Sequence, residues 1–161
     1  MQRISAMPNA SPDPQVQFAA VEELLTRWLK ERREVLGKYT EIAVAIDGVL
    51  GPDGVATRQA ALCQILVDYV SVGHFEVFHE LLAEAESFGD GTSSLAQNVM
   101  PAIADTTEVI MAYDEKYGEG VGTEKKLKRD LSALGEALEA RFALEDQLIA
   151  GLHNSHRRQA G

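Results

Sequence analysis

Glutamate and histidine side chains occur at spacings that could bind metal ions. Glu76 and His79 form a Glu-x-x-His motif, which places a carboxylate and an imidazole on one face of a helix. A di-iron centre in a helical bundle needs two such motifs and a glutamate from each of two further helices. The chain contains the motif once, although Glu139 and Glu145 add carboxylates near its end. Because half of the ligand set is missing, we expect a solvated helix face and keep a metal-binding bundle as the alternative.

The other reactive side chains also lack the partners that catalysis requires. His153 and His156 could chelate a divalent ion, but two ligands in a mobile chain end give a weak signal. Cys63, the only cysteine, lies on an apolar helix face, where a free thiol acts as a small hydrophobe. The sequence offers no nucleophile elbow and no glycine-rich phosphate loop after a strand. It therefore predicts neither an enzyme nor a bound cofactor or metal.

Apolar residues recur at intervals of three and four, the spacing of an amphipathic helix. The first stripe predicts a helix from about Gln15 to Ile46, and the Gly- and Pro-containing turn at 47–54 ends it. Thr57 is a candidate cap for a second helix, which Gly73 interrupts, so the glycine marks a kink or a close approach of another backbone. The apolar stripe of the first helix consists of Phe18, Val21, Leu25, Trp28, Leu29, Leu36 and Tyr39.

Two more helices follow in the second half of the chain. The polar run 88–94 predicts a loop whose last serines cap a third helix. Pro101 falls inside that helix and predicts either a bend or a helix that starts there. Residues 117–123 form the next linker, and Thr123 caps a fourth helix whose leucine stripe ends at Leu152.

Four long amphipathic helices joined by short turns predict an all-α fold, an up-and-down four-helix bundle. We expect a single domain at 15–153, a disordered N-terminal tail at 1–14 and a flexible C-terminal tail at 154–161. A bundle that closes its own core needs no partner to fold, so we expect a monomer. No signal peptide and no membrane-spanning stretch is expected, and a single thiol fits a reducing cytoplasm.

The charge of the chain is concentrated in its middle. The formal net charge is −10, and residues 51–122 hold twelve carboxylates but only two basic side chains, Arg58 and Lys116. Such a surface repels nucleic acid and attracts basic partners. Simple solubility explains an acidic surface equally well. The distribution therefore argues against direct binding to nucleic acid and leaves a basic protein partner open.

Two segments break the local rules of a helix. In the segment 66–78, Asp68 and His74 interrupt an apolar and aromatic run around Gly73. It is either a kinked core helix or a docking surface with aromatic anchors beside a carboxylate. In the second segment, Arg141 and Glu145 lie one turn apart near the leucine stripe, and we interpret them as an internal ion pair.

These segments resemble the regulator of sigma D family, which includes Rsd and AlgQ. The resemblance extends from about Leu24 to Leu152. Three stretches carry it: LCQILVDYVSVGHFEVF at 62–78, LGEALEARFALEDQLI at 134–149 and TRWLKERREVL at 26–36. It implies a helical bundle that acts as an anti-sigma factor. The implied partner is region four of the bacterial primary sigma factor, a basic module that reads the promoter −35 element and contacts core RNA polymerase.

We therefore expect stoichiometric sequestration of the sigma factor without chemistry; a cytosolic binder of another basic regulatory protein is a further alternative. Asp68 is predicted as the central carboxylate of the contact, with Tyr69 and Phe75 as anchors. Trp28 could equally belong to the core, because large aromatic side chains are usually well buried. The predicted contact residues are Asp68, Tyr69, Gly73, His74, Phe75, Arg27 and Trp28.

Overall fold

The computed structural model describes residues 13–46, 52–119 and 125–160, and within these ranges every regular element is helical. In chain order the elements are α1 (Pro14–Ala45), α2 (Pro52–Val72), the π-helical segment η2 (Gly73–Val77), α3 (Phe78–Phe88), the 3₁₀ turn η3 (Thr92–Ser94), α4 (Leu95–Tyr117), α5 (Leu127–Leu152), the 3₁₀ turn η4 (Asn154–His156) and α6 (Arg157–Ala160).

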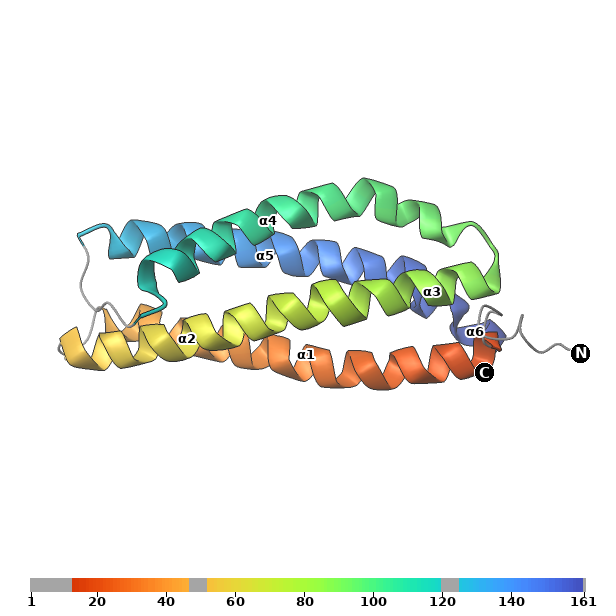
Figure 1. The fold of residues 1–161 in the computed structure, drawn as a ribbon, viewed down its shortest axis with the longest axis horizontal. Helices are drawn as coiled ribbons and strands as arrows, with labels where there is room; N and C mark the ends of the chain where they lie inside the picture. Colours follow the sequence, from red (N-terminus) through yellow and green to blue (C-terminus); the bar gives the residue numbers. More distant parts are fainter. Residues whose placement is uncertain (1–12, 47–51, 120–124, 161) are drawn as a thin grey trace, which may run out of the picture.

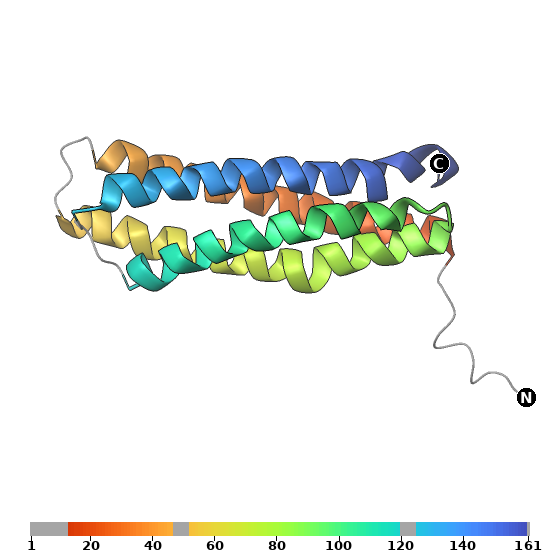
Figure 2. The ribbon, with the colours of Figure 1, turned by 90° about the horizontal axis from the view of Figure 1, so that it is seen from above.

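The long helices lie side by side as an up-and-down bundle, as predicted (Figure 1). The segments α2, η2 and α3 follow one another without a break and form a single rod. Successive rods run in opposite directions, with α1 against α2 and α4 against α5 (Figures 1 and 2). The bundle core is therefore lined by one apolar stripe from each rod.

The first helix begins where the sequence places its capping residues. The Asp13 carboxylate accepts a hydrogen bond from the Gln15 backbone N–H at 2.9 Å, and Pro14 occupies the first turn, where its missing N–H costs nothing. The predicted stripe is wrong at one position, because Leu36 is 50% exposed. Val35 and Ile42 are buried instead, since the helix register turns Leu36 outward.

The second helix starts earlier than predicted. It begins at Pro52, so Thr57 lies inside the helix and the predicted cap is wrong. Proline favours the first helical turn and opens the helix there. Most of the predicted turn at 47–54, and the predicted cap Thr123, lie outside the described residues, as does most of the predicted N-terminal tail.

Gly73 marks a close approach, although it is a side chain and not the predicted second backbone that comes close. A Cβ atom added there would lie 3.0 Å from Trp28 Cζ2 on α1, so the rod comes close to the indole only because this residue has no side chain. The helical ladder widens at this point into the π turn of η2, where Phe78 N–H bonds to Gly73 O. The rod thus accommodates Gly73 without ending.

The third rod runs through its proline. The helix α4 begins at Leu95 and continues past Pro101, and Figure 1 shows it bowed along its length. A proline removes one helical hydrogen bond and pushes the chain outward, which accounts for a bend rather than a new start. Ser94 occupies the predicted cap position, but its hydroxyl donates to Gly91 O instead of accepting from the helix.

The end of the chain differs from the expected flexible tail. After α5, the turn η4 and the short helix α6 fold back against the bundle, and His153 and His156 are fully buried. Both imidazoles contact the buried carboxylate of Glu84, so polar contacts order a stretch that has no apolar period. The prediction of a mobile end at 154–161 is therefore wrong for the described residues.

One helical stretch, Gly54–Phe88, is long and apolar enough by composition to cross a membrane, which the sequence analysis did not expect. Its apolar residues include Leu62, Leu66 and Leu81, which are buried in the bundle core. The core helix of a water-soluble bundle has the same composition, so this stretch is weak support for a membrane span.

Candidate partner-binding surface

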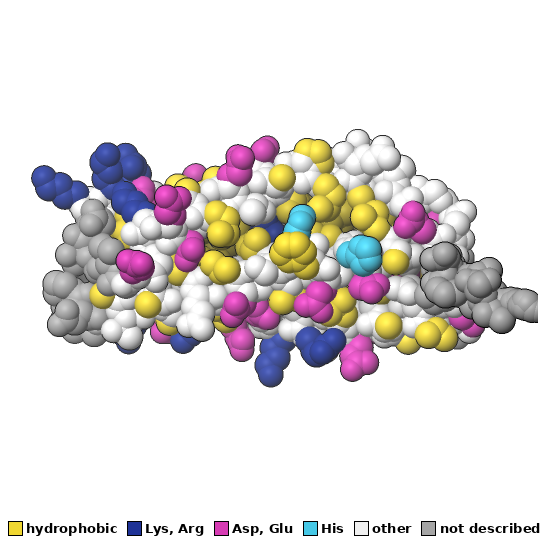
Figure 3. Space-filling view, viewed as in Figure 1, with side chains coloured by type: hydrophobic (Ala, Val, Ile, Leu, Met, Phe, Trp, Pro, Cys, Tyr) yellow, Lys and Arg dark blue, Asp and Glu magenta, His cyan; other side chains and the backbone are white. Residues whose placement is uncertain are grey.

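The π turn of η2 carries an exposed aromatic side chain. Phe75 is 73% exposed, which is unusual for a phenylalanine. The exposed His74 imidazole lies beside it, with the two ring centres 4.7 Å apart. Figure 3 shows hydrophobic and histidine side chains gathered on the middle of this face, with acidic side chains around them. The predicted residues His74 and Phe75 are thus both available for contact.

The predicted residues Trp28, Tyr69 and Gly73 are buried under this surface. Trp28 stacks on Tyr69 with ring centres 4.9 Å apart, and its Nε1–H donates to Tyr69 O at 3.2 Å. Phe78 packs edge-on against the same indole at 5.8 Å. Trp28 therefore belongs to the core, one of the two alternatives that the sequence left open, and it supports η2 from below.

Tyr69 cannot serve as an exposed anchor in this conformation, which corrects the role predicted for it. Its side chain is fully buried, and its hydroxyl donates to the Glu145 carboxylate on α5. Burial, followed by the nearby Glu145 charge, raises the pKa of Tyr69 far above its usual value, so the hydroxyl stays protonated and remains a donor. Tyr69 ties the rod that carries Phe75 to α5.

The predicted ion pair of Arg141 and Glu145 is present and fully buried. Arg141 Nε donates to Glu145 Oε2 at 3.0 Å, and Arg32 Nη1 from α1 lies 3.4 Å from the other carboxylate oxygen. Arg141 also donates to the hydroxyl of Thr107 at 2.8 Å, which joins α5 to α4. Burial raises the pKa of Glu145 despite these cations. The network holds three rods in register beneath the surface.

Carboxylates line the two hollows beside the exposed aromatic, Glu76 on one and Glu108 on the other. Asp68 is exposed, and within the described residues no ion pair involves Asp68, Glu76 or Glu108. The pKa of Glu31 on α1 is raised, first by burial and then by the charges of Asp68 and Glu34. These carboxylates are close enough to repel one another, so the surface around Asp68 carries a negative potential that a basic partner would relieve.

Arg27 lies next to Phe75 at the edge of this region. It is exposed on α1 and lines a groove of about 330 Å³ together with Phe75, Glu76 and His79. Four of the seven predicted residues are exposed: Arg27, Asp68, His74 and Phe75. We call these four residues the η2 surface.

Sequence reasoning missed the contribution of α4 to this region. Met100, Pro101 and Thr107 line a second groove on the other side of Phe75. They follow Phe75 by more than twenty residues in the chain, and only the antiparallel return of α4 brings them close. Pro101 was the only sign of this in the sequence, because a proline inside a helix is unfavourable and indicates that the local structure of the helix is unusual there.

The candidate metal ligands do not converge. In the part of the chain that the structure describes, no group of three or more His, Cys, Asp or Glu side chains could hold a metal ion. Glu76 and His79 are both exposed on the rod. Burial raises the pKa of Cys63 to about 12, so this buried thiol stays protonated at neutral pH and is a poor nucleophile.

An exposed aromatic side chain among carboxylates on a helical bundle has the features of a protein-binding surface. The particular family follows from sequence comparison. A profile of the family described as "Regulator of RNA polymerase sigma(70) subunit, Rsd/AlgQ" matches residues 9–153. The chain belongs to this family of regulatory proteins, which agrees with the resemblance seen in its sequence.

Curated relatives carry a matching name. A protein named "Regulator of sigma D" from Yersinia enterocolitica is 35% identical over 134 residues, which cover 79% of this chain and 78% of the relative. The protein of the same name from Salmonella paratyphi A is 36% identical over 133 residues, covering 79% of this chain and 80% of the relative. No solved structure shows significant similarity to this chain.

Proposed function

We propose that this protein binds region four of the bacterial primary sigma factor and sequesters it from promoter −35 DNA and from core RNA polymerase. Membership of the Rsd/AlgQ family supports a sigma factor as the partner. The observation that carries the proposal is the exposed Phe75 on the η2 surface, together with Asp68, Glu76 and Glu108, exposed carboxylates that form no ion pair within the described residues. A basic DNA-binding module complements this surface in charge.

The mechanism needs no chemistry. The negative potential around Asp68 attracts the basic module over a distance of about 10 Å at moderate salt. Phe75 then enters an apolar pocket of the partner and supplies most of the short-range binding energy. The basic side chains that would hold the DNA phosphates are occupied by carboxylates, so binding to this protein and to the promoter compete.

The predicted residues divide between two roles. Arg27, Asp68, His74 and Phe75 contact the partner from the η2 surface. The buried residues Trp28, Tyr69 and Gly73 fix the position of the π turn through the stacked rings and the close backbone approach. The protein acts as a monomer in the cytoplasm and binds one sigma factor per chain.

Calorimetric titration with isolated region four, at low and high salt, tests the proposal. We expect one-to-one binding that weakens as salt rises, because exposed charges are screened. Phe75→Ala should weaken binding by about tenfold or more, the effect of losing a central aromatic anchor. Val44→Ala is the matched control, since Val44 is 67% exposed on α1 away from η2. Absence of binding at both salt concentrations would overturn the proposal.

Reversing a single charge tests whether binding depends on the η2 surface or only on the net negative charge of the chain. Asp68→Arg should abolish measurable binding while helicity and melting temperature stay unchanged, because Asp68 is exposed and has no ion-pair partner among the described residues. Glu139→Arg, at an exposed position on α5, changes the net charge equally and should alter affinity only slightly. Equal effects of the two variants would mean that only net charge matters.

A further inference from the structure

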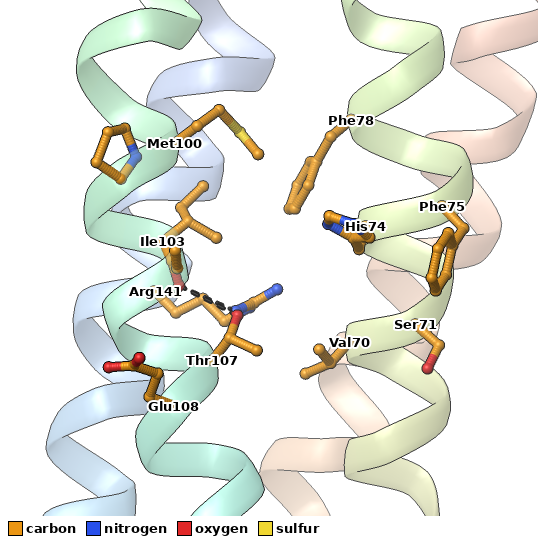
Figure 4. Close-up of a pocket in the computed structure, with 12 residues that line it drawn as sticks. Val70, Ser71, His74, Phe75, Phe78, Met100, Ile103, Thr107, Glu108 and Arg141 are labelled. Carbon is orange, nitrogen blue, oxygen red and sulfur yellow. Dashed lines mark hydrogen bonds between the residues drawn. The ribbon is translucent and has the colours of Figure 1, made fainter.

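An apolar groove lies between the α2–η2 rod and α4, and it shares His74 and Phe75 with the η2 surface at its rim. Its volume is about 630 Å³, within the range of small-molecule sites. Most of its lining is aliphatic or aromatic (Figure 4). The lining residues that matter here are Val70, His74, Phe78, Met100, Ile103 and Arg141.

The inner wall of the groove includes a buried guanidinium group, and in the part of the chain that the structure describes one of its nitrogens is free to donate a hydrogen bond. The Arg141 side chain is 1% exposed; its Nε donates to Glu145 and its Nη1 to Thr106 and Thr107. Among the described residues Nη2 has no hydrogen-bond partner, and it is not sealed from the groove. Figure 4 shows the guanidinium reaching from α5 into the space between Ile103 and Val70.

The buried carboxylate beside Arg141 does not fully neutralise the positive charges around it, so one more anion would be favourable there. That carboxylate, Glu145, is shared with Arg32, so two guanidinium groups contact one fully buried carboxylate. The second carboxylate near Arg32 is Asp146, which is 60% exposed and therefore screened by water. A donor of this kind in an apolar wall makes a stronger hydrogen bond to an anionic acceptor than it would in water.

We propose that this groove binds a small monocarboxylic acid with an unbranched alkyl or aryl body. The carboxylate accepts from Arg141 Nη2, and the apolar body lies against Phe78, Met100 and Ile103. The titratable groups at the rim are His74 and Glu108, both exposed to water. An acidic protein is a poor occupant, because the net charge of −10 repels it, whereas a small acid carries a single charge.

Three probes of equal chain length test the proposal: octanoate, 1-octanol and octylammonium. Binding is followed on the full-length protein by chemical-shift changes of the amides that line the groove. We expect octanoate to bind about tenfold more tightly than octanol, because only octanoate forms a charge-assisted bond with Arg141. The general negative field of the protein favours octylammonium instead, so the order of the three affinities separates a local site from general electrostatics.

A variant that fills the groove locates the site without disturbing Arg141. Ala104 is exposed on α4 and lines the groove, so Ala104→Trp should abolish the octanoate shifts. Ala140→Trp, at an exposed position on α5 outside this groove, should leave them unchanged. Equal affinity for octanoate and octanol, or octanoate shifts that persist in Ala104→Trp, would overturn the proposal.

Discussion

Two glutamates, Glu145 in the middle of the bundle and Glu84 at its end, are both fully buried but have different partners. Glu145 contacts two arginines and a tyrosine, groups that keep their protons across the whole physiological range. Glu84 contacts the Nδ1 atoms of His153 at 2.5 Å and of His156 at 2.7 Å. The partners of the first carboxylate therefore keep their charge state near neutrality, whereas the second carboxylate is held by two imidazoles, of which His153 has a raised pKa.

The cluster at the bundle end extends in both directions from Glu84. His153 Nε2 lies 2.7 Å from Glu22 on α1, and His156 Nε2 lies 3.0 Å from Asp90 in the loop after α3. The two imidazoles stack on Phe18 and Phe88, each with ring centres 4.1 Å apart. The chain end is thus fixed to two rods by charge and by stacking, while the central network fixes the rods beneath the η2 surface.

The largest expected effect comes from breaking the central pair. Arg141→Leu leaves the buried Glu145 carboxylate without one of its cations and should reduce the free energy of unfolding by roughly 3–5 kcal/mol, as for other buried pairs that lose one partner. Chemical denaturation at neutral pH measures this. In the double variant Arg141→Leu, Glu145→Leu most of the loss should be regained, because no unpaired charge is left. A double variant as unstable as the single one would contradict this account.

The matching change at the bundle end is Glu84→Gln. It removes the charge that both imidazoles contact and should reduce the free energy of unfolding by about 2–3 kcal/mol at pH 6, where charge-assisted hydrogen bonds are intact. At pH 8.5 the loss should be smaller, because deprotonation of His153 leaves a neutral imidazole that gains less from a carboxylate. Glu145→Gln serves as the comparison, and its effect should be similar at both pH values. Denaturation curves at the two pH values decide between these outcomes.

How far the sequence predicts these regions depends on the distance along the chain between the contacting residues. The helical rods follow from the period of three and four, and Arg141 with Glu145 is recognisable because the two residues lie one turn apart. The sequence left the burial of Tyr69 open and could not predict the acceptor of its hydroxyl, which lies 76 residues further along the chain. His153 and His156 resembled a mobile end for the same reason, because their partner Glu84 lies on another rod.

The pH dependence of the unmodified protein is a smaller effect. Burial lowers the pKa of His153, but hydrogen bonds to Glu84 and Glu22 outweigh it, so the folded-state pKa lies above 6.5. A raised histidine pKa stabilises the fold fully below about 6.5, and the stabilisation is lost as pH rises through the folded-state value. We therefore expect the free energy of unfolding to fall as pH rises through this range. His153→Gln should flatten this dependence, whereas His79→Gln, at an exposed histidine, should not.

The smallest expected effect lies at the exposed edge of the same cluster. Hydrogen bonds from Arg157 and then from His153 lower the pKa of Glu22 from 4.5 to about 2. Glu22 and Arg157 are 44% and 51% exposed, so water screens the pair and Arg157→Ala should cost less than about 1 kcal/mol. A carboxyl group whose pKa is lowered by folding stabilises the fold at pH values above its unfolded-state pKa. The cost of Arg157→Ala should therefore appear above about pH 4.5 and vanish as pH falls towards 2.

A cost as large as that of Glu84→Gln would mean that α6, rather than the buried imidazoles, holds the end of the bundle. Measuring the free energy of unfolding of Arg157→Ala and Glu84→Gln as a function of pH therefore shows whether the exposed ion pair or the buried imidazoles fix the chain end.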